Sequence, residues 1–437
     1  MQAKINEYGN TIQRTEGEGA FQGTEIGSIP QDWKVVRLGD VCKKVKAGGT
    51  PSRGQESYWN GDIPFLLIED MSATEKYLRH TKSSITKKGL ENSSSWIVPP
   101  NSIILSLYGT VGKAVINEIP ISITQNMAGI IPNEQKVYTD FLYYALENSK
   151  KYLWTVIDIS VHKHITTTKA KQIPIPLPSL PEQQRIAKVL GTIQRAIEQQ
   201  NKIIEAAKNL KKSLMEKLFT EGRYGEEQKE TEIGFIPKSW TAAPLEANAE
   251  FQYGYTATAV EGDIGPRFLR ITDIGDNGKI IWEKVPHCEI DEEEVQKYRL
   301  VDGDILVARI GATTGKTCMI QEAPKAVFGS YLIRILVDKE KCCPEYVYYF
   351  TNTSLYWSQI NANKEGKLKK GVSASFLKTL IIPLPPLPEQ QEIARLLRSV
   401  DKKIDLEQRT KKTLQELFKT MLHKLMTGEI RLKDVEV

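Results

Sequence analysis

LPEQQRIAKVL, at Leu180–Leu190, returns as LPEQQEIARLL at Leu387–Leu397, an offset of 207 residues. Each copy follows a proline-rich run with the apolar residues of a short strand, IPIPLPSL before the first and LIIPLPPL before the second. Pro181 and Pro388 suit the first turn of a helix, where the missing N–H would have no partner in any case. The next residue in both copies is glutamate, whose charge favours the positive end of a helix. Each copy therefore predicts a strand that leads into a helix.

The sequence after each copy carries one apolar stripe. Apolar residues recur at spacings of three and four over about forty residues, which is typical of an amphipathic helix about 60 Å long. Because so long a stripe must be buried, we expect the two helices to pair with each other. The alternative is that each helix packs only on its own domain. The predicted stripes are Ile186, Leu190, Ile193, Ile197, Ile204, Ala207, Leu210, Leu214 and Leu218, and Ile393, Leu397, Val400, Ile404, Leu414, Leu417, Met421 and Leu425.

Polar residues interrupt these stripes. Gln200, Glu407 and Lys411 fall near stripe positions, so we expect the pairing to be loose or locally hydrated in the middle. Three further apolar residues lie beside the stripes, where helices of a partner protein could pack on them. These three residues are Ile203, Ala206 and Leu396.

A second repeated marker lies upstream of each helix. TEIGSIPQDWKVVRLGD at Thr24–Asp40 matches TEIGFIPKSWTAAPLEA at Thr231–Ala247, again 207 residues apart. Short apolar runs broken by Gly, Pro and Asn follow in each half and predict strands, and the stretches Tyr138–Trp154 and Pro344–Ile360 predict helices. The expected fold is α+β, with two tandem pseudo-symmetric domains, each followed by a long helix, and the two helices pairing as an antiparallel coiled coil. The expected boundaries are a tail at 1–23, a first domain at 24–178, its helix at 179–222, a linker and second domain at 223–385, and a helix and tail at 386–437.

Composition limits the class of protein. At 437 residues the chain is long enough for two or three domains. The 59 Lys and Arg residues exceed the 54 Asp and Glu residues only slightly, so charge alone does not indicate nucleic-acid binding. The five cysteines show no metal-ligand spacing, and we expect free thiols in a reducing compartment. Because the sequence has no run of 18 apolar residues and no signal-peptide core, we expect a cytoplasmic protein without a membrane segment.

These landmarks make the chain resemble the specificity subunits of type I restriction–modification enzymes. The resemblance covers nearly the whole chain after residue 23. Two copies of the proline–glutamate–glutamine run, each closing a domain and opening a helix, are its most specific element. The residues that carry it are Ile29–Leu38 and Ile236–Leu245 (I-P-x-x-W-x(4)-L), Gly61–Met71 with its echo Gly265–Ile274, and Pro176–Ala187 and Pro383–Ala394 (P-L-P-x-L-P-E-Q-Q-x-I-A).

The resemblance implies a DNA reader without catalysis of its own. Each α+β domain would be a target-recognition domain for one half of a split site in double-stranded DNA. The helices would pair as a spacer, and two modification subunits would dock on them, bringing S-adenosylmethionine and adenine methylation. Restriction subunits would join through the modification subunits, and this chain would hold no cofactor. A repeated domain-plus-helix unit independently suits a bipartite site whose halves lie about one helical turn apart.

Two glycine-rich turns carry a lysine each, GTVGKA at Gly109–Ala114 and GATTGKT at Gly311–Thr317. A P-loop needs four residues between its first glycine and the Gly-Lys pair, and the second turn has three. Nucleotide binding is therefore disfavoured. Two readings stay open: a turn that brings Lys113 or Lys316 to DNA phosphate, and a plain hairpin turn.

Loops at equivalent places in the two halves supply the other candidates. GGTPS, at Gly48–Ser52, resembles a loop near the DNA face in the family, and YGYTAT, at Tyr253–Thr258, is its counterpart. The basic loops VHKHI and GKLKKG lie 207 residues apart, and either phosphate contact or plain solvation would explain them; the two His lack a metal-ligand partner. The predicted DNA-binding residues are Thr50, Ser52, Arg53, Tyr58, Tyr108, Lys113, His162, Lys163, His164, Tyr253, Tyr255, Arg270, Arg309, Lys316, Lys367, Lys369 and Lys370.

Two other classes of function stay open as alternatives. One is a coiled-coil scaffold whose domains bind protein. The other is a DNA-modifying enzyme in its own right, but the sequence has no Asn/Asp-Pro-Pro-Tyr/Phe tetrapeptide and no glycine-rich loop of the kind an S-adenosylmethionine site would need. We therefore expect a non-catalytic specificity subunit.

Overall fold

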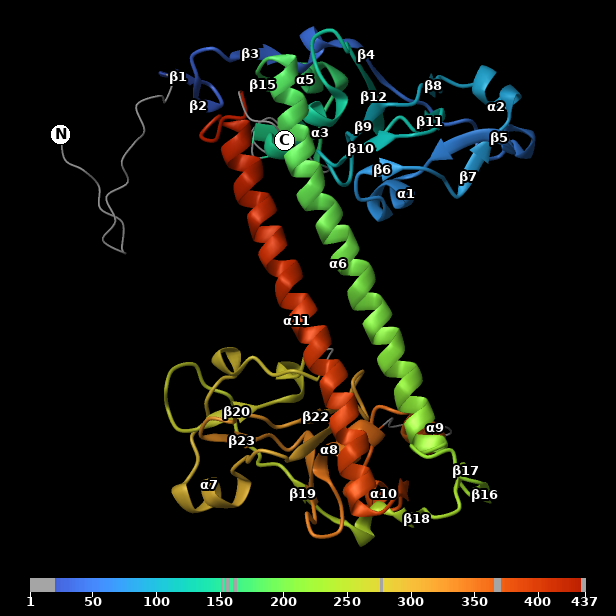
Figure 1. Cartoon of the computed structure of the whole chain (residues 1–437), viewed down its shortest axis with the longest axis vertical. Helices are drawn as coiled ribbons and strands as arrows, with labels where there is room; N and C mark the ends of the chain where they lie inside the picture. Colours follow the sequence, from blue (N-terminus) through green and yellow to red (C-terminus); the bar gives the residue numbers. More distant parts are fainter. Residues whose placement is uncertain are drawn as a thin grey trace, which may run out of the picture. The chain divides into compact units, whose positions relative to one another are not determined.

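The computed structural model describes residues 20–150, 152–153, 158–159, 163–275, 278–364 and 371–433. The chain divides into two compact units. Unit 1 comprises residues 1–199 and 410–437, and unit 2 comprises residues 200–409. Two long helices, α6 (Leu180–Thr220) and α11 (Leu387–Met426), each contribute one half to unit 1 and the other half to unit 2 (Figure 1).

Unit 1 contains two sheets. Their strands are β4 (Cys42–Ala47), β5 (Trp59–Leu66), β6 (Tyr77–Leu78), β7 (Ser83–Ile85), β8 (Ile97–Val98), β9 (Ser102–Ser106), β10 (Ala114–Asn117), β11 (Ile121–Ile123) and β12 (Met127–Pro132). One sheet has the order β4-β12-β9-β10-β6, antiparallel apart from β6, and the other has the order β7-β5-β11-β8. The remaining elements are β1 (Phe21–Thr24), β2 (Gly27–Pro30), β3 (Lys34–Arg37), β13 (Asp158–Ile159), β14 (Lys163–His164), β15 (Pro174–Leu177), α1 (Ile68–Ala73), α2 (Lys87–Glu91), α3 (Thr139–Asn148) and α5 (Thr167–Lys171).

Unit 2 repeats the same plan with fewer strands. Its elements are β16 (Gln228–Thr231), β17 (Gly234–Pro237), β18 (Thr241–Pro244), β19 (Ala249–Tyr253), β20 (Arg267–Leu269), β21 (Ile305–Ala308), β22 (Thr317–Met319), β23 (Ala326–Phe328), β24 (Leu332–Val337), β25 (Ile381–Leu384), α7 (Glu292–Tyr298), α8 (Pro344–Phe350), α9 (Ser354–Lys364) and α10 (Ala374–Lys378). The main sheet has the order β19-β24-β21-β22, and β20 pairs with β23 in parallel. The predicted α+β class is therefore confirmed for both repeats.

The two repeated sequence motifs hold each other in both units. The indole Nε1–H of Trp33 donates to Glu182 Oε2 at 3.2 Å, and that of Trp240 donates to Glu389 Oε2 at 3.1 Å. Both bonds link the tryptophan of the I-P-x-x-W motif to the glutamate of the L-P-E-Q-Q motif, and all four side chains are buried. A strand pair closes the same joint, β3 with β15 in unit 1 and β18 with β25 in unit 2. The motifs are repeated because each pair anchors a long helix to its α+β part.

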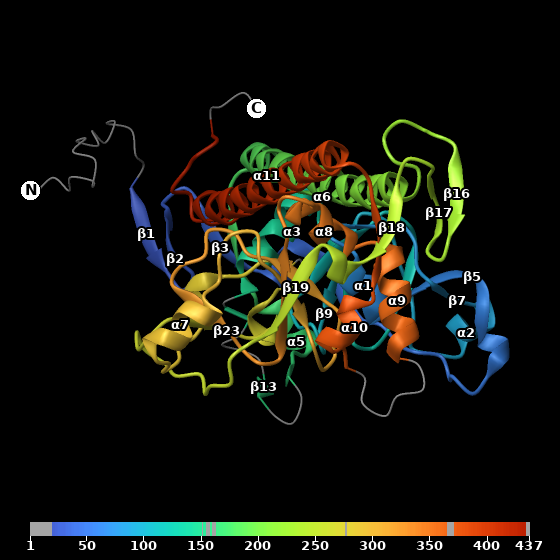
Figure 2. The same ribbon diagram turned by 90° about the horizontal axis from the view of Figure 1, so that it is seen from below.

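Each unit joins opposite ends of the two long helices. In unit 1, Ile186 and Leu190 of α6 share one buried core with Leu425 and Met426 of α11. In unit 2, Phe219 near the end of α6 shares a core with the residues that begin α11, Ile393 and Leu397 among them. The start of each helix thus meets the end of the other, and in each unit the two segments run side by side (Figures 1 and 2). The predicted antiparallel pairing is confirmed.

The predicted stripe is wrong at two positions. Leu210 is 60% exposed and Leu417 is 44% exposed. At 3.6 residues per turn, Leu210 lies roughly 120° around the helix from Ile204, and Leu417 roughly 140° from Ile404, outside a stripe about 100° wide. The next residue along each helix faces the partner instead. Phe418 packs against the core of unit 1, and Lys211 forms an ion pair of 2.7 Å with Asp401 of α11.

The middle of the helix pair is also tighter than expected. Gln200 and Glu407 are both buried, and Gln200 Nε2 donates to the carbonyl of Glu407 at 3.1 Å and to its side-chain carboxylate. Leu396, expected to lie free for a partner, packs against the core of unit 2 because the α+β part covers that side of the helix. Ile203 and Ala206 are exposed, as predicted. The other predicted seam residues are buried (Ile186, Leu190, Ile393, Leu397, Ile404) or half-buried (Ile193, Ile197, Val400).

Candidate nucleic-acid interface

Backbone segments from four parts of the chain meet at one end of the main sheet in each unit. We call this the strand-end rim: residues 47–52, 107–109, 124–126 and 164–165 in unit 1, and residues 253–255, 309–311, 329–331 and 371–374 in unit 2. In unit 1, Leu107 N–H donates to Asn126 O at 2.8 Å, and Ile165 N–H donates to Leu107 O at 3.0 Å. In unit 2, Arg309 N–H donates to Tyr331 O at 2.9 Å, and Val372 N–H donates to Arg309 O at 3.0 Å. The two rims therefore share one backbone frame.

A glycine, Gly48 in unit 1 and Gly254 in unit 2, lies at the same place in both rims, where two backbone segments come close together. A Cβ at Gly48 would overlap the carbonyl of Ile123, and a Cβ at Gly254 would overlap the carbonyl of Gly329. Gly48 N–H donates to Met127 O at 3.1 Å, and Gly254 N–H donates to Leu332 O at 3.2 Å. The predicted correspondence between GGTPS and YGYTAT is thus confirmed at the backbone.

The side chains on the unit 1 rim are mainly uncharged and polar. The hydroxyl of Thr50 hydrogen-bonds to Gln125 Oε1. Tyr108 is 37% exposed, and its backbone bridges to that of His164. The indole N–H of Trp59 donates to the carbonyl of Ser52 at 3.1 Å, and this bond holds the backbone of the loop. Arg53 is exposed, and Tyr58 is half-buried in the short helix that follows.

The unit 2 rim is aromatic and basic. The Arg309 guanidinium lies 4.9 Å from the centre of the Tyr253 ring, and the Tyr253 hydroxyl accepts the backbone N–H of Ala374 at 3.0 Å. Figure 1 shows α10, which Ala374 begins, near β19, which Tyr253 ends. Tyr255 packs its ring 5.4 Å from that of Tyr298. Tyr331, which no sequence pattern singled out, is 56% exposed at the same rim.

The two glycine-rich turns are hairpin turns, joining β9 to β10 and β21 to β22. Gly109 and Gly112 in one, and Gly311 and Gly315 in the other, take positive φ angles of 75° to 90°, which suit glycine. Lys113 Nζ donates to Ser72 O at 3.0 Å, and partial burial lowers the pKa of this lysine. Lys113 is therefore anchored to the end of α1. Lys316 is half-buried in the equivalent turn.

Arg270 is occupied by a neighbour. Its Nε and a terminal nitrogen donate to the two oxygens of Asp273 at 3.0 Å and 2.9 Å, and this carboxylate raises the pKa of Arg270. The same carboxylate accepts the Arg270 backbone N–H at 2.8 Å and so caps the short helix 271–273. A DNA phosphate would have to compete with Asp273 for two of the three nitrogens of this guanidinium.

Part of the predicted basic loops lies outside the described residues. This holds for His162, Lys367, Lys369 and Lys370, and for the side chain of Lys163, whose backbone belongs to β14. His164 is half-buried on the unit 1 rim.

Four further residues of unit 1, Lys44, Lys46, Gln125 and Asn126, belong to the candidate surface although sequence reasoning missed them. Lys44 and Lys46 alternate along the exposed face of β4, with their ammonium groups 4.2 Å and 5.9 Å from the Trp96 ring. Lysine at i and i+2, on the same face of a predicted strand, is the signal that could have revealed them. Gln125 and Asn126 carried no signal beyond that of an ordinary turn between two strands.

The described residues contain no group of three or more His, Cys, Asp or Glu side chains placed to hold a metal ion.

Burial raises the pKa of Cys318 and of Cys342 to about 12, which keeps these thiols protonated at neutral pH. Within the part of the chain that the structure describes, no helix is both long and apolar enough to cross a bilayer.

Comparison with known proteins identifies the family. The family model for the type I restriction modification DNA specificity domain matches residues 30–209 and 264–416. The MjaVIII specificity subunit of Methanocaldococcus jannaschii is 28% identical over 93% of this chain and 95% of that protein. The EcoKI specificity subunit of Escherichia coli K12 is 23% identical over 92% of this chain and 90% of that protein.

Two solved structures share the fold. The S subunit of a type I restriction–modification system from M. genitalium aligns with a TM-score of 0.57 at 14% identity, over 90% of this chain and 96% of that one. A chain from a structural study of complex assembly in the type I system aligns with the same score at 16% identity, over 92% of this chain and 99% of that one. The family match spans both repeats, and the chain therefore belongs to the type I restriction–modification DNA specificity family, as a specificity subunit.

Proposed function

We propose that each unit of this chain reads one half of a bipartite DNA site through its strand-end rim. The two long helices set the separation of the half-sites and carry two modification subunits. Those subunits supply S-adenosylmethionine and adenine methylation, and restriction subunits assemble through them. This chain itself supplies recognition and no chemistry.

One observation carries the proposal. The two rims have the same backbone hydrogen bonds and a glycine at the same place, but they present different side chains. Gln125 of unit 1 stands where unit 2 has Ser330, and the buried Leu107 of unit 1 stands where unit 2 has the half-exposed Arg309. A shared frame with exchanged side chains is what two readers of different short sequences require, because base edges differ whereas the frame that approaches the groove need not.

The exposed apolar residues on the long helices support docking of two copies of one partner. Leu210 and Leu417 lie 207 residues apart, so they occupy equivalent places on α6 and α11, and both are exposed. An exposed leucine repeated in this way gives two equivalent contact points, and two contact points suit two identical subunits. Replacing both leucines by Asp should abolish assembly with the cognate modification subunit, whereas the Lys208→Asp control on the same helix should leave it intact. Analytical ultracentrifugation would show the difference.

A domain exchange tests the reading of half-sites. Replacing Thr24–Pro178 with the same region of a relative should change one half of the methylated motif and leave the other half and the spacing unchanged. Methylome sequencing of cells that express the chimera with its modification subunit measures both halves at once. A change in both halves would contradict independent reading. Loss of all methylation from a folded, assembled complex would do the same.

The two alternative functions give different results in the same system. A protein-binding scaffold would show no motif-dependent DNA binding in a gel shift with the modification subunit present. An autonomous enzyme would methylate or cleave DNA as the isolated chain. Titration calorimetry of the isolated chain with S-adenosylmethionine should show no binding.

A further inference from the structure

The side chain of Arg309 is pre-positioned for a ligand outside the protein. Its backbone is fixed on both sides, by the bond to Tyr331 O and by the bond from Val372 N–H. Its guanidinium is stacked over Tyr253, whose hydroxyl is itself fixed by Ala374 N–H. Within the described residues, its guanidinium has no recorded hydrogen bond or ion pair, although Arg309 is only half-exposed. None of the described residues thus accepts from the five N–H donors that are held at the rim.

The chemistry of the guanidinium limits the acceptor to two classes. A planar fork with parallel N–H groups fits the O6 and N7 atoms of guanine in the major groove, and it also fits a phosphate. Stacking on an aromatic ring holds the plane of the fork and leaves its edge available. The side chain therefore offers a defined edge rather than a mobile charge.

Comparison with unit 1 separates these two classes. The residue at the equivalent place is Leu107, which makes the same two backbone bonds but is buried in the core. Phosphates recur along every duplex, so a phosphate contact at this place of the frame would be expected in both units. A base contact would be expected to differ between the units, as it does here. The frame also forms with leucine, so the arginine is not needed to build it.

We propose that Arg309 reads a guanine in the half-site bound by unit 2, and that Tyr253 is the positioning residue that holds its guanidinium. This inference rests on the proposed function and adds to it the identity of one base pair and of the residue that selects it. Unit 1, with Leu107 at the same place, makes no guanine contact there.

Randomised duplexes test this in the assembled methyltransferase complex. Methylation of a library with both half-sites randomised is sequenced for wild type, Arg309→Ala, Arg309→Lys and the control Arg299→Ala, which removes an exposed arginine elsewhere in unit 2. Arg309→Ala should lower the preference for one G·C pair by about 10- to 100-fold in one half-site only. Arg309→Lys should restore part of it, because lysine also pairs with guanine but without the fixed fork. Arg299→Ala should leave the motif unchanged.

Two variants of Tyr253 test its positioning role separately. Tyr253→Phe keeps the ring and should keep the motif, whereas Tyr253→Leu should relax the same base pair as Arg309→Ala. A structural role for Tyr253 alone would instead lower methylation of every sequence without changing the motif.

Three results would overturn the assignment. The first is a wild-type half-site for unit 2 that contains no G·C pair. The second is that Arg309→Ala lowers methylation of all sequences equally and flattens the salt dependence of DNA binding, which would assign the residue to a phosphate contact. The third is an unchanged motif. A library without any two-part motif for wild type would instead overturn the proposed function itself, so the two failures are distinguishable.

Discussion

Each unit has a joint between its α+β part and the two long helices. The two joints differ in which part of the chain supplies the lysine beside the tyrosine contact. In unit 1, Tyr144 of α3 donates its hydroxyl to Gln194 of α6 at 2.9 Å; in unit 2, Tyr349 of α8 donates to Asp401 of α11 at 2.9 Å. Gln194 and Asp401 are 207 residues apart and are therefore equivalent. The tyrosine contact is retained, but the residues around it are exchanged.

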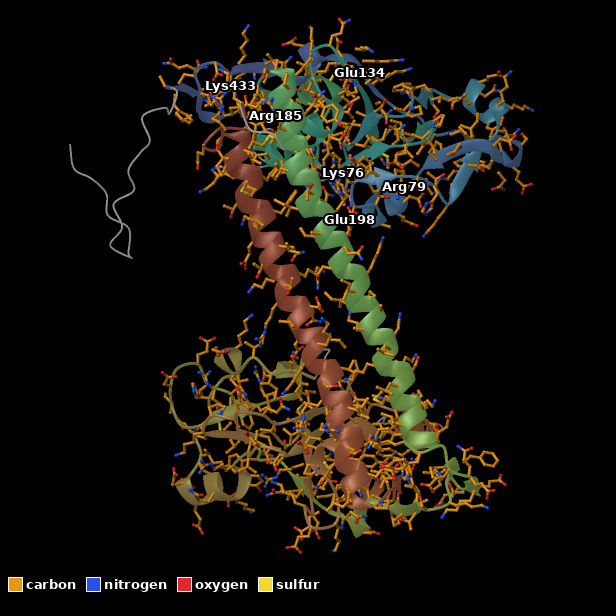
Figure 3. All side chains as sticks on the ribbon, in the orientation of Figure 1. Lys76, Arg79, Glu134, Arg185, Glu198 and Lys433 are labelled. Carbon is orange, nitrogen blue, oxygen red and sulfur yellow. The ribbon has the colours of Figure 1, made fainter. Side chains whose placement is uncertain are left out.

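In unit 1 the cation comes from the α+β part. Lys76 is 3% exposed, lies 2.5 Å from Asp140 and donates to the Tyr144 hydroxyl at 3.0 Å. Figure 3 shows Lys76 beside the part of α6 that carries Glu198. Burial lowers the pKa of Lys76, while the hydrogen bond and charge of Asp140 oppose that shift. The side facing α11 is apolar there, with Phe418 6.1 Å from the Tyr144 ring.

In unit 2 the cation comes from α6, the long helix that pairs with α11. Lys211 of α6, the equivalent of Phe418, binds Asp401 and lies 5.3 Å from the centre of the Tyr349 ring. The comparison shows that the frame fixes where each helix meets its domain, whereas the neighbouring side chains can exchange charge for apolar contact. The same freedom at the strand-end rim would allow different half-sites.

The largest expected difference between the units concerns the glutamates that anchor the tryptophans. Glu182 also binds the Arg431 guanidinium at 2.9 Å, whereas among the described residues Glu389 accepts N–H groups of Trp240 and of the Arg223 backbone and pairs with no cation. Removing the buried partner of an ion pair is costlier than removing an acceptor. Glu182→Ala should lower the free energy of unfolding by about 3 kcal/mol, and Glu389→Ala by about 2 kcal/mol. Urea unfolding of the full chain measures both.

Glutamine variants sharpen this comparison. Glutamine keeps an acceptor for the indole N–H but carries no charge for Arg431. Glu389→Gln should therefore be tolerated better than Glu182→Gln. Equal losses would mean that Arg431 contributes nothing to the unit 1 joint.

A medium effect is expected where Phe418 and Lys211 occupy equivalent positions. Phe418→Ala should cost about 2 kcal/mol, because a half-buried ring leaves the core of unit 1. Lys211→Ala should cost about 1 kcal/mol or less, since its ion pair is partly exposed. Thermal unfolding of the two variants beside Leu210→Ala, an exposed control, would test the order. A larger loss for Lys211→Ala would contradict it.

These pairs also show what the sequence could predict. The repeat offset located both joints, both long helices and the start of each helix, because proline, glutamate and spaced apolar residues act locally. Which residue faces the helix seam was off by one at Leu210 and Leu417, since a stripe of apolar letters does not fix the rotation of a helix against its partner. The bond between Trp33 and Glu182 spans 149 residues and leaves no local signal.

At the strand-end rim, too, some features could be predicted from the sequence and others could not. The loops at Gly48 and Gly254 were predicted from their sequence, and a close backbone approach explains the glycine in each, but their contact with DNA stays a prediction. The availability of a charged side chain could not be predicted, because it depends on neighbours that the fold supplies. Arg270 has Asp273 beside it, whereas the side chain of Arg309, among the described residues, lies over the face of Tyr253 without a carboxylate partner.

The smallest effect is expected at Gln200 and Glu407, which are each other's equivalents in the repeat. Hydrogen bonds from Lys403 and from Gln200 lower the pKa of Glu407 below its usual value. A carboxyl group with a lowered pKa in the folded state stabilises the fold above its unfolded pKa, and this contribution is lost as the pH falls through the folded pKa. The effect therefore lies in the acid range, below about pH 4.5.

Glu407→Gln removes this titration but keeps a side chain that can bond to Gln200. Urea midpoints measured across the acid range should therefore fall less steeply with pH for Glu407→Gln than for wild type, and Lys403→Met should shift the wild-type slope toward that of the variant. Glu407→Leu should differ from both at every pH, because the buried Gln200 amide loses its side-chain acceptor and keeps only the backbone carbonyl of residue 407. A buried polar pair between the two helices also disfavours shifted registers, since any shift separates the partners. Parallel pH profiles for Glu407→Gln and wild type would show that ionisation of Glu407 does not contribute to folding stability in the acid range.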